Sequence, residues 1–277
     1  MGQRLNNMKS TPILSAGLAL LLAACGGDGS GSATREDGYQ SSLRQADEAR
    51  KSGNINSAIP LYGRALQAEP DGVEAKLGLG QSYLAVGAAG EAAAQFRDVL
   101  ARESGNAAAR RGLGAALIAG GQPALAEKQL ELAIRGDSRD YRAQNAMGVA
   151  LDMQGRHAEA RARYLMGLEA APENVSLRNN LGLSLIIAGE AAQAIAILTP
   201  LAASRDADVR LRQNLAFAYA VAGDFEQSLA VIRQDVREED AQRQLSYFIQ
   251  LRGLSAEARS LEVRRNPNFF PQASGGV

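Results

Sequence analysis

The chain has 277 residues, 46% of them hydrophobic, and this content excludes a wholly disordered protein. Lysine and arginine together number 30, as do aspartate and glutamate, so the net charge is zero and only a local basic patch could bind nucleic acid. There is one cysteine, one histidine and no tryptophan, against an excess of alanine, leucine and glycine. This composition is typical of closely packed helices.

The first 24 residues have the pattern of a secretory signal peptide. Two basic residues, Arg4 and Lys9, precede a run of small or apolar residues at positions 13–24 that is interrupted only by Ser15. This run is too short to span a bilayer, which takes about 20 apolar residues. We therefore expect residues 1–24 to be a cleaved signal peptide, and Met8 could equally be the true start.

The segment Leu22-Ala23-Ala24-Cys25 resembles the lipobox of bacterial lipoprotein precursors. The resemblance implies that Cys25 carries diacylglycerol, becomes the new N-terminus and is then N-acylated, since two or more fatty-acid chains such as palmitate give stable anchoring. Gly26 follows in place of the aspartate that retains lipoproteins at the inner membrane. This favours attachment to the outer membrane, facing the periplasm. The alternative is an unmodified small residue or an odd thiol at Cys25.

After Cys25 the chain is rich in glycine and polar residues as far as Gly38. Such a segment has little apolar surface to bury. Residues 25–38 are therefore predicted to be the lipidated cysteine and a flexible linker.

Glycine recurs every 34 residues through the body of the chain. The periodic glycines are Gly53, Gly87, Gly121, Gly155, Gly189 and Gly223. A small residue lies seven positions before each of them: Ala46, Gly80, Gly114, Gly148, Gly182 and Ala216. A column of larger side chains keeps the same period: Tyr62, Phe96, Leu130, Tyr164, Leu198 and Ile232. Agreement over six units indicates an internal repeat.

This period and these positions resemble the tetratricopeptide repeat (TPR). The resemblance implies an all-α fold, a TPR superhelical solenoid of six helical hairpins at residues 39–238. The six units begin at Tyr39, Val73, Ala107, Tyr141, Val175 and Val209. In each unit the periodic glycine is expected to end the first helix in the left-handed conformation. No unit can bury its apolar face alone, so stacking of the hairpins supplies the core.

Two Gly-x-Gly pairs, Gly78-Gly80 and Gly112-Gly114, superficially resemble phosphate-binding loops. They fall inside expected first helices and no strand precedes them. We interpret them as glycines that allow close helix packing.

The period shifts at the C-terminal end, after the charged run at residues 237–240. Small and apolar residues then recover the pattern if the last unit starts four residues early. Residues 239–264 are therefore predicted to be a degenerate seventh repeat, a capping hairpin or helix in which Tyr247 and Phe248 close the core. Residues 265–277 are predicted to be a tail.

The sequence lacks the pairs of residues that catalysis requires. An enzyme would need a nucleophile with a base, a paired acid and base, a metal cluster or a phosphate cradle. His157 follows Gly155 at the start of a second helix, where we expect a surface residue, and without another histidine or a nearby cysteine it predicts no zinc site. We expect no enzyme activity, no metal, no cofactor and no small-molecule substrate.

By resemblance to TPR proteins, the first helices line an inner surface that binds protein partners. The residues at the lining positions of the last three units, apart from Asp152 and Ile186, form the predicted partner-binding groove: Arg142, Asn145, Val149, Met153, Asn179, Asn180, Leu183, Ile187, Arg210, Gln213, Asn214, Phe217 and Val221. Leu43 and Asp47 replace the lysine and asparagine of the TPR dicarboxylate clamp, so recognition of a C-terminal carboxylate by that device is not expected.

Four apolar residues of this groove are not needed for packing within a hairpin: Leu183, Ile187, Phe217 and Val221. They predict an exposed stripe for an extended segment or an amphipathic helix, beside amides of Asn180 and Asn214 that could pair with a peptide backbone. The alternative is that the C-terminal helices fold back over the stripe and bury it.

The whole layout resembles the TadD-like lipoproteins of tight-adherence (Flp) pilus systems. The resemblance is carried by the lipobox, six in-phase units, the strings at residues 178–182 and 213–216, and the ending from Tyr247 to Leu254. It implies a non-catalytic scaffold that holds a secretin or another pilus component at the outer membrane. The alternatives are a pilotin of type IV pili or type II secretion, an accessory of outer-membrane protein assembly, or a regulatory subunit of a cell-wall enzyme.

Overall fold

The computed structural model describes residues 30–205 and 207–266. Within these residues the chain forms fourteen α-helices and no strands, so the all-α prediction is confirmed. The helices are α1 (Ser30–Lys51), α2 (Ile55–Ala68), α3 (Val73–Ala85), α4 (Ala89–Arg102), α5 (Ala107–Ala119), α6 (Pro123–Gly136), α7 (Tyr141–Met153), α8 (His157–Ala170), α9 (Val175–Ala188), α10 (Ala191–Ala202), α11 (Val209–Ala222), α12 (Phe225–Ile232), α13 (Glu238–Arg252) and α14 (Ala256–Arg265). None of these helices is long and apolar enough to cross a membrane.

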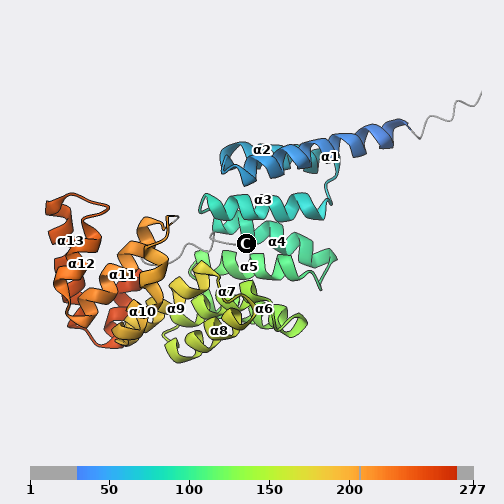
Figure 1. Ribbon diagram of the computed structural model, residues 1–277. Coiled ribbons are helices and arrows are strands. Elements are labelled where there is room, and N and C mark those ends of the chain that lie inside the picture. The colour runs from blue at the N-terminus through green and yellow to red at the C-terminus, as the bar shows by residue number, and fades with distance from the viewer. Residues whose placement is uncertain (1–29, 206, 267–277) are drawn as a thin grey trace, which may run out of the picture.

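The predicted flexible linker is wrong for residues 30–38, which belong to α1. The N-terminal part of α1 projects beyond α2 in Figure 1. The glycines of the linker are concentrated before Ser30, and from there no proline interrupts the helix that Tyr39 anchors in the core. Helix extension from an anchored turn adds one hydrogen bond per residue, so it continues outward without a new nucleus. Cys25 lies outside the described residues.

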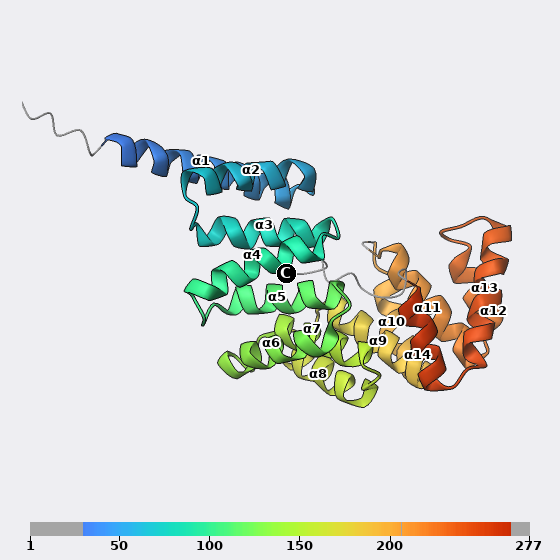
Figure 2. The same ribbon diagram turned by 180° about the vertical axis from the view of Figure 1, so that it is seen from behind.

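Six helical hairpins, α1–α2 to α11–α12, stack in chain order (Figures 1 and 2). The six periodic glycines separate the two helices of each hairpin, and all have positive φ, between 71° and 92°. The residue after the glycine also donates back across the turn, as from Ala88 N to Tyr83 O at 2.9 Å. This is the Schellman pattern of helix ends, which a side chain at the glycine would strain. The predicted role of the periodic glycine is confirmed.

At several places in the core, a large side chain of an even-numbered helix packs against bare backbone of an odd-numbered one. The ring of Phe96 in α4 lies where Cβ atoms on two glycines would be, 2.4 Å from that of Gly112 in the next hairpin and 2.7 Å from that of Gly80 in its own. Tyr62 takes the same place against Gly78. These glycines allow close helix packing, and the phosphate-loop interpretation is excluded because they lie within helices.

The inner surface of the stack is lined by the odd-numbered helices. Neighbouring odd-numbered helices from α1 to α11 contact one another, whereas neighbouring even-numbered helices of the described chain do not pack as closely. The row of odd-numbered helices is therefore the shorter side of the curved stack seen in Figures 1 and 2. We call the exposed side of this row the inner face.

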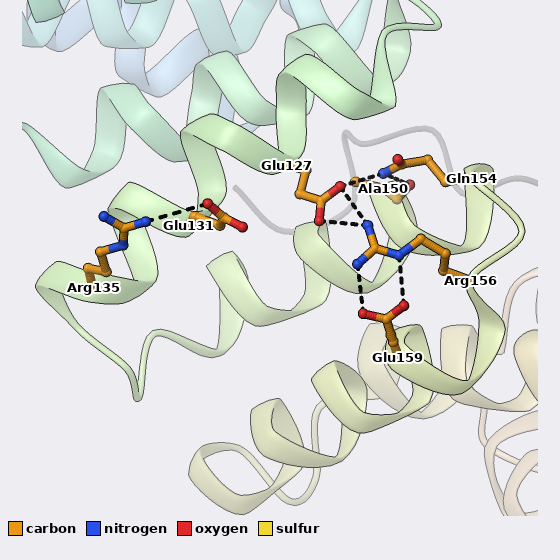
Figure 3. Close-up of polar contacts among 7 residues, drawn as sticks. All are labelled: Glu127, Glu131, Arg135, Ala150, Gln154, Arg156 and Glu159. Carbon is orange, nitrogen blue, oxygen red and sulfur yellow. Dashed lines mark hydrogen bonds and ion pairs between the residues drawn. The ribbon is translucent and has the colours of Figure 1, made fainter.

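A polar network joins the third hairpin to the fourth (Figure 3). Glu127 of α6 accepts hydrogen bonds from Arg156 Nη1 at 2.7 and 2.9 Å and from Gln154 Nε2 at 2.8 Å. Arg156 also pairs with Glu159. Burial raises the pKa of Glu127, but the hydrogen bonds from Gln154 and Arg156 outweigh it and lower the pKa overall. The ionised carboxylate of Glu127 thus connects α6 to the turn between α7 and α8.

Replacing Gly112 with alanine should lower the free energy of unfolding by about 1–3 kcal/mol, because the new Cβ has no space beside the Phe96 ring. Gly63→Ala in α2 is the control, since a Cβ there meets nothing within 4 Å and removal of glycine from a helix is worth about 0.5–1 kcal/mol. Urea unfolding followed by circular dichroism measures both changes. Equal effects of the two substitutions would contradict the packing argument.

Candidate functional site: the inner face

The inner face has a covered part and an open part. Helix α13 packs against α11, and α14 packs against α9, so the C-terminal hairpin covers the inner face of the last two units (Figure 2). Helix α14 has no comparable packing against α1, α3 or α5 within the described residues. Among these residues the C-terminal hairpin therefore leaves the inner face of the first four units uncovered, apart from the hydrogen bond of Arg264 to Met153 at the end of α7.

The predicted exposed stripe is wrong, because the C-terminal hairpin buries it. The exposed fractions are 4% for Leu183, 1% for Ile187 and 0% for Phe217, while Val221 is half-buried. The ring of Phe217 lies 5.0 Å from that of Phe248 in α13, centroid to centroid. The alternative drawn from the sequence, that the C-terminal helices fold back over these residues, is confirmed.

The two amides predicted to pair with a peptide backbone each donate instead to an asparagine of the preceding unit. Asn180 Nδ2 donates to Asn145 Oδ1 at 2.9 Å, and Asn214 Nδ2 donates to Asn179 Oδ1 at 2.8 Å. Asn180 and Asn214 are buried. Buried amides need such partners, and here each bond links the first helix of one unit to that of the next.

The other groove residues differ in exposure. Val149 is buried, Met153 and Gln213 are half-buried, and Arg142 and Arg210 are exposed. Arg142 lies over the ring of Tyr141, with 4.8 Å from its guanidinium carbon to the ring centroid. Of the predicted groove, only a part thus remains available to a partner.

Arg259 of α14 holds the C-terminal hairpin in place. Its guanidinium donates to the carbonyl oxygens of Ile186 and Ile187 at the end of α9, at 3.2 and 2.9 Å. It also donates to three carbonyls around the turn between α13 and α14, those of Leu251, Arg252 and Leu254. Helix C-termini carry unpaired carbonyls and a partial negative charge, which favour a cation. Burial lowers the pKa of Arg259, but five acceptors satisfy the five N–H groups of its side chain.

The turn that forms this cap differs from those of the six repeats. Gly253, which ends α13, has φ of −72° and is not left-handed. Helix α14 accordingly leaves α13 in another direction and reaches α9. The predicted seventh hairpin is present as two helices, with Phe248 in the core and Tyr247 partly buried, but its second helix packs on the inner face.

A buried polar cluster centres on Asp152, and no pattern in the sequence predicted it. Asp152 accepts hydrogen bonds from Tyr164 Oη at 2.9 Å and Ser184 Oγ at 3.0 Å, and it contacts His157 Nδ1 at 2.7 Å. The prediction of a surface His157 is wrong, since its side chain is 13% exposed. The turn at Gly155 directs α8 back along α7 and brings the imidazole to the last turn of α7. The periodic pattern contains no signal for this contact.

The cluster does not have the geometry of a catalytic relay. Ser184 bonds to the carboxylate and not to the imidazole, so hydroxyl and base are not paired. The buried Nε2 of His157 has no hydrogen-bond partner in the described chain. Burial, followed by the nearby Asp152 carboxylate, raises the pKa of Tyr164 well above its ordinary value. The cluster therefore joins the fourth unit to the fifth. In the described residues no group of three acidic, histidine or cysteine side chains could hold a metal ion.

The chain belongs to the tetratricopeptide repeat family. The family model, described as a tetratricopeptide repeat, matches residues 43–107, 81–140, 112–175 and 145–208. Proteins of this family are in general non-catalytic scaffolds that mediate protein–protein interactions. No curated protein sequence is significantly similar to the chain.

Solved structures of bacterial proteins share the fold. A tetratricopeptide repeat protein of Parabacteroides merdae is similar with a TM-score of 0.63 and 14% identity, over 76% of this chain and 84% of its own. PilF of Pseudomonas aeruginosa gives a TM-score of 0.63 and 17% identity, over 78% of this chain and 99% of its own. PilW, described as a widely conserved type IV pilus biogenesis factor, gives a TM-score of 0.63 and 19% identity, over 76% of this chain and 98% of its own. At these identities the likeness shows the fold alone.

Replacing Arg259 with alanine should release α14 from α9, because five carbonyls lose their donor at once. A buried acceptor left without its hydrogen-bond donor costs about 1–3 kcal/mol. Hydrogen exchange of residues 256–265 should accelerate strongly, and Arg259→Lys should not restore protection, since an ammonium lacks the planar fork.

The matched control is Arg265→Ala, in the same helix, whose side chain is 74% exposed and pairs only with Glu262 among the described residues. It should leave the exchange of α14 nearly unchanged. Equal exchange in the Arg259 and Arg265 variants would refute the anchoring role of Arg259.

Proposed function

We propose that this chain is a lipid-anchored, non-catalytic scaffold of the outer membrane, facing the periplasm, that binds protein partners during assembly of a pilus or secretion system. The observation that carries the proposal is the inner face of the first four units, which the C-terminal hairpin leaves uncovered among the described residues. A curved row of helices with an exposed inner side is the surface by which repeat proteins bind polypeptides.

The lipid anchor rests on the sequence around Cys25. Only residues 26–29 lie between this cysteine and the start of α1 at Ser30. Helix α1 has 22 residues and so is about 33 Å long at 1.5 Å per residue. We infer that the spacing between the membrane and the later repeats is controlled by a helix more than by a coil. Anchoring restricts the scaffold to two dimensions and raises its effective concentration near membrane partners.

The kind of partner is proposed from two sources. The sequence resembles TadD-like lipoproteins of tight-adherence pilus systems, for which a secretin or another pilus component is the expected partner. PilW, described as a type IV pilus biogenesis factor, shares the fold. The latter likeness favours the pilotin-like role in type IV pilus biogenesis as the second candidate.

Replacement of Cys25 by serine should abolish labelling by radioactive palmitate and move the protein from the membrane fraction to the soluble fraction. A serine hydroxyl cannot take up the thioether-linked diacylglycerol, so the diacylglycerol and the N-acyl group that is added after it are both lost. Mass spectrometry of the mature wild-type protein should find the lipid on Cys25. An unmodified cysteine there would refute the anchor and leave the scaffold role open.

Partner binding is tested by co-purification from detergent-solubilised membranes of the native bacterium, with charge introduced on the open inner face. Gln81 occupies in the second unit the position that Leu183 has in the fifth, and Gln40 occupies in the first unit the position that Arg142 has in the fourth. The double variant Gln40→Lys, Gln81→Lys should lose the partners that co-purify with the wild type, because the substitutions add positive charge to the open inner face without altering the core.

The control is the double variant Gln95→Lys, Gln129→Lys, which adds the same charge at half-buried glutamines of the even-numbered helices α4 and α6. Variants of Leu183 or Phe217 are unsuitable, because these residues are core and their loss would unfold the last units. Unchanged partners in the Gln40→Lys, Gln81→Lys variant would refute binding by the inner face. Absence of any partner from wild-type membranes would refute the scaffold function itself.

A further inference from the structure

The C-terminal hairpin contributes one arginine to the end of each odd-numbered helix that it passes. Arg259 donates to Ile187 O at the end of α9, and Arg264 donates to Met153 O at the end of α7. Ile187 and Met153 are the thirteenth residues of their units, one repeat apart. At the third end, the Arg252 guanidinium lies beside Gly223, 3.3 Å from where its Cβ would be.

These arginines supply a charge that the repeats themselves lack. Helices α3, α5, α7, α9 and α11 have no basic residue in their last turn, whereas α1 has Arg50 and Lys51. The C-terminal hairpin complements the ends of α7, α9 and α11. The ends of α3 and α5 remain without a cation from the described chain.

The thirteenth residues of the second and third units are Ala85 and Ala119, and both are exposed. No side chain of the described residues donates to their carbonyl oxygens. Neither end contains a charged residue, from Leu84 to Ala88 or from Ile118 to Gln122. The partial negative charge of two helix C-termini is therefore accessible on the open inner face, in line with the two carbonyls that α14 already binds.

We propose that the ends of α3 and α5 bind a basic segment of a partner protein, whose arginines donate to the Ala85 and Ala119 carbonyls as α14 donates to those of the next two units. This inference rests on the proposed scaffold function and defines the chemistry of its partner. Arg264 lies five positions after Arg259, a rise of about 7.5 Å in a helix, so a helix with arginines at this spacing spans adjacent units. Residues 266–277 of the chain contain no lysine or arginine and cannot supply these contacts.

The probe is a fluorescein-labelled peptide with the sequence of residues 255–266, added to the purified full-length protein in a fluorescence anisotropy titration. A second peptide carries glutamine in place of its three arginines. We expect the arginine peptide to bind and the glutamine peptide to bind at least about tenfold weaker, since charged hydrogen bonds are the stronger ones. Ala119→Lys should weaken binding of the arginine peptide by a similar factor, because it places a like charge at the end of α5.

Ala101→Lys is the matched control, an exposed alanine in the last turn of the even-numbered α4, and it should leave binding unchanged. Equal binding of the two peptides would overturn the proposal. Binding that Ala119→Lys does not weaken would overturn it too, because it would indicate that the peptide replaces α14 on α7 and α9. Failure of the arginine peptide to bind would overturn it too. The scaffold function would survive these outcomes, because it depends on the co-purification of partners.

Discussion

Contact between a large side chain of one helix and the bare backbone of its neighbours is the constraint on which this structure depends. Phe96 fills the volume that Cβ atoms on Gly80 and Gly112 would occupy, and Tyr164 does the same at Gly148. Helices can approach this closely only where a side chain is missing, so each large residue determines which helix faces it. Repetition of the pair at 34 residues extends one local contact into a continuous core.

The curvature of the stack determines where it can bind. Odd-numbered helices contact one another along the stack and form the shorter, inner row. Their ends point in one direction, and their carbonyls form a line of partial negative charge along one edge. The C-terminal hairpin uses part of this line for its own arginines. What remains accessible is the inner face of the first units, which is where a partner is proposed to bind.

The C-terminal hairpin gives the stack two different ends. At one end α13 and α14 cover the apolar residues of α9 and α11, which would otherwise be an exposed patch at risk of non-specific association. At the other end α1 extends as a single helix toward the proposed lipid anchor. In this arrangement the proposed partner surface lies toward the end of the proposed anchor, and the core is closed at the other end.

The sequence by itself determined the all-α fold, the six hairpins and the left-handed glycines, because these depend on contacts within one unit and the next. It also indicated that the C-terminal residues would complete the core. Only the tertiary structure decided that α14 packs on α9, that Phe217 is core and that His157 meets Asp152. Arg259 contacts Ile186 across 73 residues and Arg264 contacts Met153 across 111. A 34-residue pattern carries no information about such pairs, since they depend on how the turn at Gly253 directs a helix through space.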